Sequence, residues 1–295
     1  MRKIWLLIGF CICLAGSQNT SQAQNLSLGF KAGLSFSNFI DDSETGPNGE
    51  NLEDFQTQTG FHIGILGRYR FYSDLLGVRF GLIYNQRGGR IDYDGPSYFI
   101  FNPEDPTYAT GMRQEEIRYS NVYLDIPIEG MVFIGRKLEI SAGGYVGFLV
   151  GSSGTGSMSF SGRSSPSDNP IENFEVFYDF SPLRDDAGLS SYIESTQISV
   201  DGIERIAPVE AGTYYEFAEK DGNYFNWLDV GLTGGLTYFL NRGLYFNAQV
   251  KYGLSHVVNE PYYISKVSLD ENREFISRDG ERRNFSLMLS LGFAF

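Results

Sequence analysis

The chain has few cysteines and histidines, and no long apolar run beyond its first residues. Its two cysteines, Cys11 and Cys13, lie close to the amino terminus, and its two histidines are His62 and His256. No later stretch approaches the roughly eighteen apolar residues that a transmembrane helix needs. These scarcities exclude a disulfide framework, a cysteine-based zinc site and a spanning helix from the rest of the chain.

Positive charge is scarce as well. The 23 lysines and arginines face 36 acidic residues, which gives a formal net charge of −13. Loss of Arg2 and Lys3 with a leader segment would make it −15. An acidic chain repels the phosphates that supply most nucleic-acid affinity, so we expect no nucleic-acid partner.

The first residues have the composition of an export signal. Arg2 and Lys3 are followed by an apolar run of about twelve residues and then by the small-residue motif Ser21-Gln22-Ala23. This order is typical of a secretory signal peptide, and the run is too short to span a membrane. We expect residues 1–23 to be cleaved and residues 24–295 to form the mature domain.

The carboxyl-terminal thirteen residues alternate strictly between large apolar and small or polar side chains. The apolar set ends with Leu291, Phe293 and the terminal Phe295, while Ser286 and Ser290 belong to the other set. Period-2 alternation predicts a β-strand with one apolar face. A tilted strand crosses a bilayer in roughly 9–11 residues. We interpret Leu291, Phe293 and Phe295 as an insertion signal for an outer membrane.

Seven other segments alternate in the same way. The eight predicted strands cover residues 26–36, 61–71, 76–87, 118–133, 138–150, 227–239, 244–256 and 283–295. Their connections are short and long in turn, as in outer-membrane proteins with short periplasmic turns and long external loops. We therefore predict an all-β fold: an eight-stranded antiparallel transmembrane β-barrel with short periplasmic turns, long extracellular loops and periplasmic termini.

The inward face of these strands collects opposite charges. The predicted interior polar network consists of Lys31, Arg68, Arg70, Arg79, Asp125, Glu129, Glu139, Asp229 and Lys251, with Arg87 beside them. Eight strands leave an interior that side chains can fill, and buried charges must pair. Ion pairs that plug the interior are the favoured interpretation, and a conduit for small solutes is the alternative.

Residues with catalytic or metal-binding chemistry are few. Ser255 and His256 lie at a strand end, where a lipid-modifying hydrolase could place them, but neighbouring residues face opposite sides of a strand. The first predicted loop holds six acidic residues between 41 and 54, which suit solvation or divalent cations. The sequence predicts no catalytic residue, cofactor or metal site.

The longest predicted loop covers about residues 151–226. It is rich in glycine and serine at first and then acidic and aromatic. A structureless loop of this length is uncommon, so segments 172–180 and 197–206 are expected to form hairpins above the barrel.

Five short motifs resemble the PorT-like outer-membrane β-barrel family. They are LGFKAGL at 28–34, YLDIPI at 123–128, AGGYVG at 142–147, KYGL at 251–254 and LGFAF at 291–295. Their order along the chain is more specific than any one of them, and the resemblance does not cover 151–226. It implies the barrel fold and, for a few members, a link to protein secretion; it implies no catalytic residue.

These observations predict an integral outer-membrane protein that is not an enzyme. We expect a monomeric scaffold or interaction protein of the cell envelope, linked to secretion in the manner of the resembled family. Its expected partners are outer-membrane lipid, the barrel-assembly machinery and other envelope or secretion proteins. A rim-sited hydrolase and a small-solute channel are the alternatives.

Overall fold

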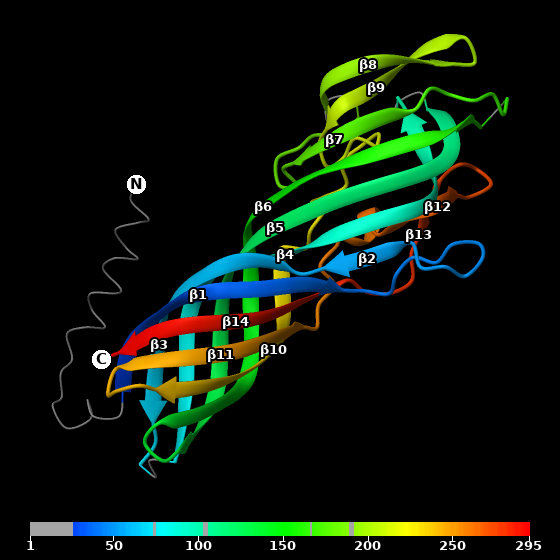
Figure 1. Ribbon diagram of the computed structural model, residues 1–295. Coiled ribbons are helices and arrows are strands. Elements are labelled where there is room, and N and C mark those ends of the chain that lie inside the picture. Colours follow the sequence, from blue (N-terminus) through cyan, green and yellow to red (C-terminus); the bar gives the residue numbers. More distant parts are fainter. Residues whose placement is uncertain (1–25, 73–74, 103–105, 166, 189–191) are drawn as a thin grey trace.

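The computed structural model describes residues 26–72, 75–102, 106–165, 167–188 and 192–295. The predicted signal peptide lies outside the described residues. No helix in the described part of the chain is long and apolar enough to cross a membrane. Almost all the regular structure is β-strand (Figure 1).

Eight strands hydrogen-bond in a closed antiparallel ring. In ring order they are β1 (Leu26–Ile40), β3 (Gln58–Arg70), β4 (Leu76–Phe101), β5 (Thr107–Ile134), β6 (Leu138–Ser164), β10 (Leu228–Phe239), β11 (Leu244–Gly253) and β14 (Arg283–Ala294). Two pairings between distant segments complete the ring, β6 with β10 and β14 with β1. Because the ring closes, the described strands have no free edge within it.

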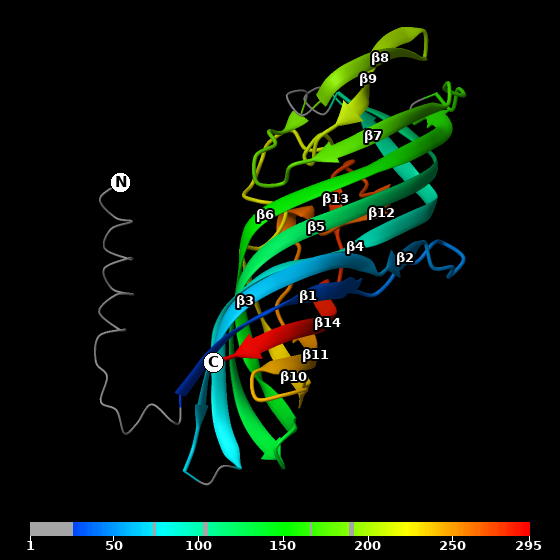
Figure 2. The ribbon, with the colours of Figure 1, turned by 60° about the vertical axis from the view of Figure 1, so that its left-hand side comes forward.

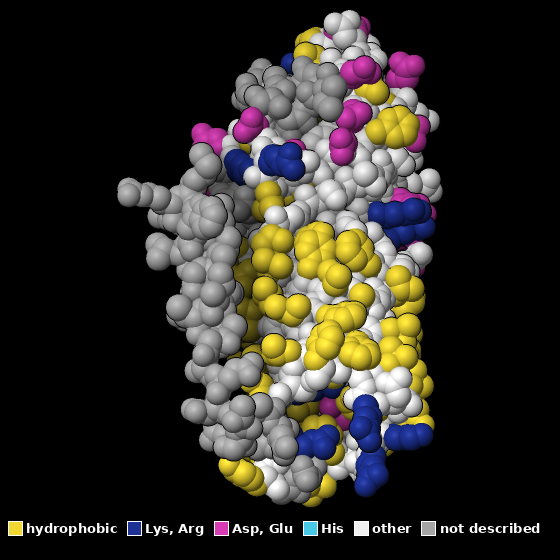
Figure 3. Space-filling model, turned by 90° about the vertical axis from the view of Figure 1, so that its left-hand side faces the viewer, with side chains coloured by type: hydrophobic (Ala, Val, Ile, Leu, Met, Phe, Trp, Pro, Cys, Tyr) yellow, Lys and Arg dark blue, Asp and Glu magenta, His cyan; other side chains and the backbone are white. Residues whose placement is uncertain are grey.

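The ring strands have their apolar face outside and their polar face inside, which is the reverse of the arrangement in a water-soluble protein. On β14, Leu287 and Leu291 point outward with 37% and 57% of their surface exposed, whereas Ser286 and Ser290 are buried inside the ring. Figure 3 shows the outward apolar side chains gathered in a belt over this part of the molecule. The predicted alternation therefore has its apolar face outside.

Three ring strands continue far beyond the others. β4, β5 and β6 contain 26, 28 and 27 residues, although the sequence predicted strand ends at 87, 118 and 150. The expected loop after Gly88 is instead a continued β4–β5 hairpin, and the first part of 151–226 is β6. The predicted strands ended too early because, near Gly88, the apolar side chains change from the outward face of the sheet to its inward face. Arg90 and Asp92 lie on the outward side, and Ile91 is buried on the inward side.

The parts of β4, β5 and β6 beyond the ring carry further strands. We call these parts and the strands on them the extension (Figure 2). It contains β2 (Glu53–Gln56) on β4, β7 (Phe174–Phe180) on β6, the β8 (Tyr192–Val200) and β9 (Ile203–Ala211) hairpin, and the pair β12 (Ile264–Leu269) and β13 (Phe275–Ser277). Segment 172–180 is mostly strand β7 rather than a hairpin, whereas 197–206 spans the turn between β8 and β9. Two buried aromatic clusters form the core of the extension.

The seam between β1 and β14 offers a test of ring closure. A Cβ on Gly33 would overlap the carbonyl oxygen of Leu289, whereas one on Gly130 would lie 3.8 Å from its nearest neighbour, the carbonyl oxygen of Ala142. Gly33→Ala should therefore destabilise the folded protein by about 1–3 kcal/mol. Gly130→Ala should change stability by less than about 0.5 kcal/mol. Urea unfolding in lipid vesicles checks both values, and equal stabilities would contradict the close approach at this seam.

Candidate functional site

Buried ion pairs cross the interior of the ring. Arg79 Nε donates to Glu129 Oε2 at 2.6 Å, and Arg79 Nη1 lies 2.9 Å from Glu139 Oε1. Arg87 lies 2.8 Å from Asp125 Oδ1, and Lys251 Nζ lies 2.6 Å from Asp125 Oδ2. None of these side chains exceeds 2% exposure. We call these residues, with Asp229, the interior network.

Asp229 belongs to the same network through Arg87. Its Oδ2 lies 3.0 Å from Arg87 Nη1 and accepts a hydrogen bond from the Tyr145 hydroxyl at 3.1 Å. One arginine from β4 thus joins carboxylates from β5 and β10, the two strands that flank β6 in the ring. The sequence placed ten charged residues on the inward face of the strands. Seven of them form these ion pairs: Arg79, Arg87, Asp125, Glu129, Glu139, Asp229 and Lys251.

The other three predicted network residues make different contacts. Lys31 donates to the side-chain oxygens of Asn247 and Gln249. Arg68 lies over the rings of Phe239 and Tyr245, at 5.2 and 4.4 Å from their centroids, and forms no ion pair with a described residue. Arg70 is exposed at the end of β3 and lies over Phe133 at 3.9 Å. Arg70 is therefore not in the buried interior, because it is the last residue of β3 and lies at the rim of the ring.

Neutral inward residues that the charge pattern did not single out complete the interior. Asn85 Nδ2 donates to Asp125 Oδ2 at 3.1 Å, and Thr233 donates to Glu129 Oε1 at 3.1 Å. His62 lies between the hydroxyls of Ser35 and Ser290, at 3.0 and 2.7 Å. These residues occupy the same alternate positions as the charges, so strand alternation was the signal that could have found them.

The residues considered for a hydrolase do not form a nucleophile–base pair. Ser255 donates to Asp229 Oδ1 at 2.9 Å. The ring of His256 lies edge-on to Tyr263, with centroids 4.7 Å apart. Each side chain is thus engaged with a different partner.

The acidic first loop is held by cations of the extension. Asp41 lies 2.8 Å from Arg282, and Glu53 lies 2.8 Å from Arg278. The backbone N–H of Lys266 donates to Glu44. Within the described residues, no group of three or more acidic or histidine side chains is arranged to hold a metal ion.

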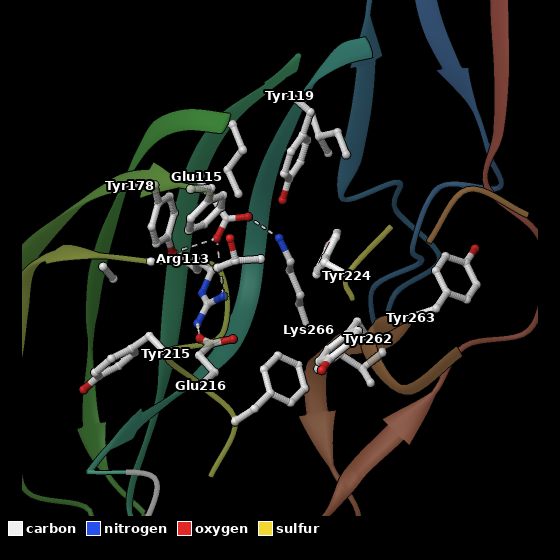
Figure 4. A pocket seen from close by; sticks show the side chains of 18 of the residues that line it. Arg113, Glu115, Tyr119, Tyr178, Tyr215, Glu216, Tyr224, Tyr262, Tyr263 and Lys266 are labelled. Atoms are coloured by element: carbon white, nitrogen blue, oxygen red, sulfur yellow. Dashed lines mark hydrogen bonds and ion pairs between the residues drawn. The ribbon is translucent and has the colours of Figure 1, made fainter. Parts of the chain in front are cut away.

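A cavity of about 90 Å³ lies inside the extension, enclosed by strands of the long sheet on one side and by β12 and the segment around Tyr262 on the other (Figure 4). We call it the extension cavity. Aromatic side chains make up much of its wall, namely Phe99, Tyr119, Tyr178, Phe180, Tyr215, Phe217, Tyr224, Tyr262 and Tyr263. Ligand sites in proteins commonly combine such walls with a few placed polar groups.

Those polar groups come from three parts of the chain. Arg113 Nη2 lies 2.6 Å from Glu216 Oε1 and also donates to the carbonyl oxygen of Tyr98 at 2.9 Å. Glu115 pairs with Lys266 and accepts from the Tyr178 hydroxyl at 3.2 Å. The long sequence separations between these partners explain why no spacing or motif revealed the cavity.

Glu115 lies beyond the apolar belt and stays ionised. Burial alone would raise its pKa, but the charges of Lys266 and Arg113 outweigh that effect and lower the pKa below its usual range. At neutral pH the cavity wall therefore carries fixed positive and negative charges.

Residues 17–259 match the model of a protein family described as "Outer membrane protein beta-barrel domain". Similar solved structures include Ail of Yersinia pestis, which is 15% identical over 92% of this chain and 99% of its own, with a TM-score of 0.33. The protease OmpT of Escherichia coli is 8% identical over 95% and 99%, with a TM-score of 0.28. Likeness to structures at this level carries no argument about function. No curated protein matches the chain.

The interior network can be tested by removing one acid. Glu129→Ala would leave Arg79 with Glu139 and Ser141 as its side-chain partners. Arg79 would keep one of its two carboxylates, but because removing one partner from a buried ion pair is costly, the variant should lose about 3–5 kcal/mol of unfolding free energy. Glu116 is the matched control, since its pairs with Arg90 and Arg118 are partly exposed.

Glu116→Ala should cost less than about 1 kcal/mol. Both variants are measured by urea unfolding in lipid vesicles and by the shift in gel mobility on heating. A Glu129→Ala variant that is as stable as Glu116→Ala would contradict the dry, paired interior.

Proposed function

Since the chain belongs to the outer membrane β-barrel family, we propose that it is a non-enzymatic, eight-stranded transmembrane barrel that presents the extension to binding partners. The observation that carries this proposal is the filled interior of the ring. At most 1% of the surface is exposed in each of five charged residues of this interior, namely Arg79, Glu129, Glu139, Arg87 and Asp125. We infer that the described residues of such a narrow ring leave no open passage through it, so that the proposed function rests on what the barrel displays.

The apolar belt supports the membrane-spanning part of the proposal. Lipid solvates the outward apolar side chains, and ring closure satisfies the backbone N–H and C=O groups, as a bilayer requires. On β5, the outward residues from Val122 to Ile134 are apolar apart from Gly130, whereas Arg118 and Glu116 beyond them are charged. This change supports a membrane boundary between Ser120 and Val122.

The connections support the orientation. The connections between β3 and β4, between β5 and β6, and between β10 and β11 are short, and the strand ends that they join lie at the same end of the ring as the carboxyl terminus (Figure 1). Outer-membrane barrels have short turns in the periplasm and longer connections outside. We therefore place both termini in the periplasm and the extension outside the cell.

The proposed partners follow from the division of the molecule into the apolar belt and the extension. Outer-membrane lipid covers the belt, and the barrel-assembly machinery recognises the last strand through Leu291, Phe293 and Phe295. These three aromatic and apolar side chains lie at the end of β14, where the N–H of Phe295 donates to the carbonyl oxygen of Leu28 at 2.8 Å. The extension would then serve an envelope or secretion partner, as in the narrower PorT-like resemblance, with the barrel itself a monomer.

Single cysteines test the orientation, because both natural cysteines lie in the predicted signal peptide. Asn272→Cys in the β12–β13 turn should react with a membrane-impermeant maleimide in intact cells. Lys137→Cys in a short turn is the matched control and should react only after the outer membrane is broken. Labelling of Lys137→Cys alone in intact cells would reverse the proposed orientation.

Planar-bilayer recording tests the closed interior. Wild-type protein should insert without steady conductance, because the charged groups of the interior network are buried in ion pairs with one another, where a pore would keep them hydrated. Insertion is verified independently by gel mobility before and after heating. Steady, ion-selective conductance whose selectivity changes in Glu129→Gln would replace the display function with the channel alternative.

A further inference from the structure

We propose that the outer edge of β8 pairs with an extended, lysine-rich peptide segment of a partner protein, which adds one strand to the sheet of the extension. The proposal rests on the display function, because it names the chemistry of a partner that the extension would bind outside the cell. It is tested on purified protein, so its failure would leave the orientation and the closed interior of the barrel untouched.

β8 is the last strand of the long sheet. The order of strands in this sheet ends with β6, β7, β9 and β8, and among the described strands β8 pairs with β9 alone. Figures 1 and 2 show β8 as the outermost strand, at the end of the extension that lies farthest from the ring. One side of its backbone is therefore open to a further strand, and peptides bind to such sheet edges through main-chain hydrogen bonds.

The turn after β8 sets which backbone groups face outward. Asp201 and Gly202 have φ values of 55° and 79°, as a two-residue type I′ turn requires. Val200 flanks this turn and forms a hydrogen-bonded pair across it, and hydrogen-bonded and non-hydrogen-bonded pairs then alternate along the hairpin. By this alternation Gln197 and Ser199 direct their N–H and C=O groups away from β9.

The composition of β8 leaves this edge unprotected. Edge strands are commonly blocked by lysine, by proline or by bulges. The nine residues of β8 include no lysine, arginine or proline. The one irregularity lies around Glu194, and the register with β9 is regular from Ser195 to Val200. The edge thus offers a regular stretch to an incoming strand.

The same edge is held in place by the core of the extension. Ile198 and Val200 are 3% and 2% exposed and belong to one of its two buried clusters. The Asp201 carboxylate fixes the turn, because it accepts hydrogen bonds from Asn169 Nδ2 at 2.9 Å and from the Ser164 hydroxyl. An edge that is already ordered loses little conformational entropy when a peptide pairs with it.

The charge of the hairpin selects a cationic segment. Residues 192–211 contain four acids and one base, and Figure 3 shows acidic side chains gathered at this end of the molecule. Glu194 and Glu210 are cross-strand partners, and neither forms an ion pair with a described residue. Like charges on opposite positions of neighbouring strands repel each other. A lysine of an added strand beside Glu194 would offset this repulsion.

The same charges disfavour a second copy of the chain as the occupant. Pairing of β8 with β8 would bring two hairpins together, each with three more acids than bases. Their repulsion opposes that dimer, whereas a lysine-rich strand neutralises the same carboxylates.

Binding is measured by fluorescence anisotropy on purified, heat-modifiable protein in a neutral detergent. The probe is a labelled eight-residue peptide of alternating lysine and threonine, since threonine favours the extended conformation. One control alternates glutamate and threonine, and the other is the lysine peptide with every backbone nitrogen methylated, which keeps the charge but cannot donate to a strand. We expect the probe to bind at least about ten-fold more tightly than either control.

Gln197→Pro tests the edge itself. Proline is tolerated on an edge strand where the N–H faces solvent, so the hairpin should fold while its outward donor is lost. The probe should bind at least about ten-fold more weakly, whereas Gln197→Ala, which keeps the N–H, should change binding by less than about two-fold. Resistance of the hairpin to limited proteolysis verifies that both variants are folded.

Glu194→Gln tests the selection of charge. It should weaken binding of the probe about three- to five-fold at low ionic strength and have a smaller effect at high salt. Glu271→Gln, exposed in the turn between β12 and β13, is the matched control and should leave the affinity unchanged.

Three results would overturn the proposal. One is equal binding of the probe and its methylated form, which would show attraction of charge without strand pairing. Another is full affinity in a folded Gln197→Pro variant, which would place the peptide elsewhere. The third is a wild-type dimer in sedimentation that Gln197→Pro dissociates, which would make a second copy of the chain the occupant of the edge.

Discussion

The hydrogen bonds between the first and last ring strands are the constraint on which the rest depends. β1 and β14 pair through twelve consecutive register positions, from Gly29 with Ala294 to Ile40 with Arg283. In hydrocarbon an unpaired N–H or C=O group costs several kcal/mol, so a sheet that crosses a membrane must close. Closure brings the inward faces of all eight strands together, and the charges on them must then neutralise one another.

Closure also fixes how wide the interior is. Arg79 and Arg87 can each reach two carboxylates on other strands because the ring is narrow. The ion pairs stabilise one arrangement of strands, since a shift in register would move an arginine out of reach of its acids. Under the proposed function, the same narrowness leaves binding to surfaces outside the ring.

The sequence predicted the ring more completely than the extension. Within the belt, one face is apolar at every second residue, so strands, direction and inward residues follow from alternation alone. Beyond Gly88 the alternation continues with its polarity reversed, because Ile91, Ile117 and Tyr119 now face a protein core while Arg90 and Glu116 face water. A search for one continuous apolar face therefore ended these strands too early.

The cavity could not have been predicted for a different reason. Arg113 and Glu115 look like ordinary charges of a loop, and their partners Glu216 and Lys266 come from separate connections of the ring. These connections approach one another because the ring returns each of them to the same end. A closed membrane ring thus gathers distant loop residues above it, and the long β4–β5–β6 sheet gives them a wall to pack against. The closure that a membrane requires of the ring is in this way what brings the walls of the extension cavity together.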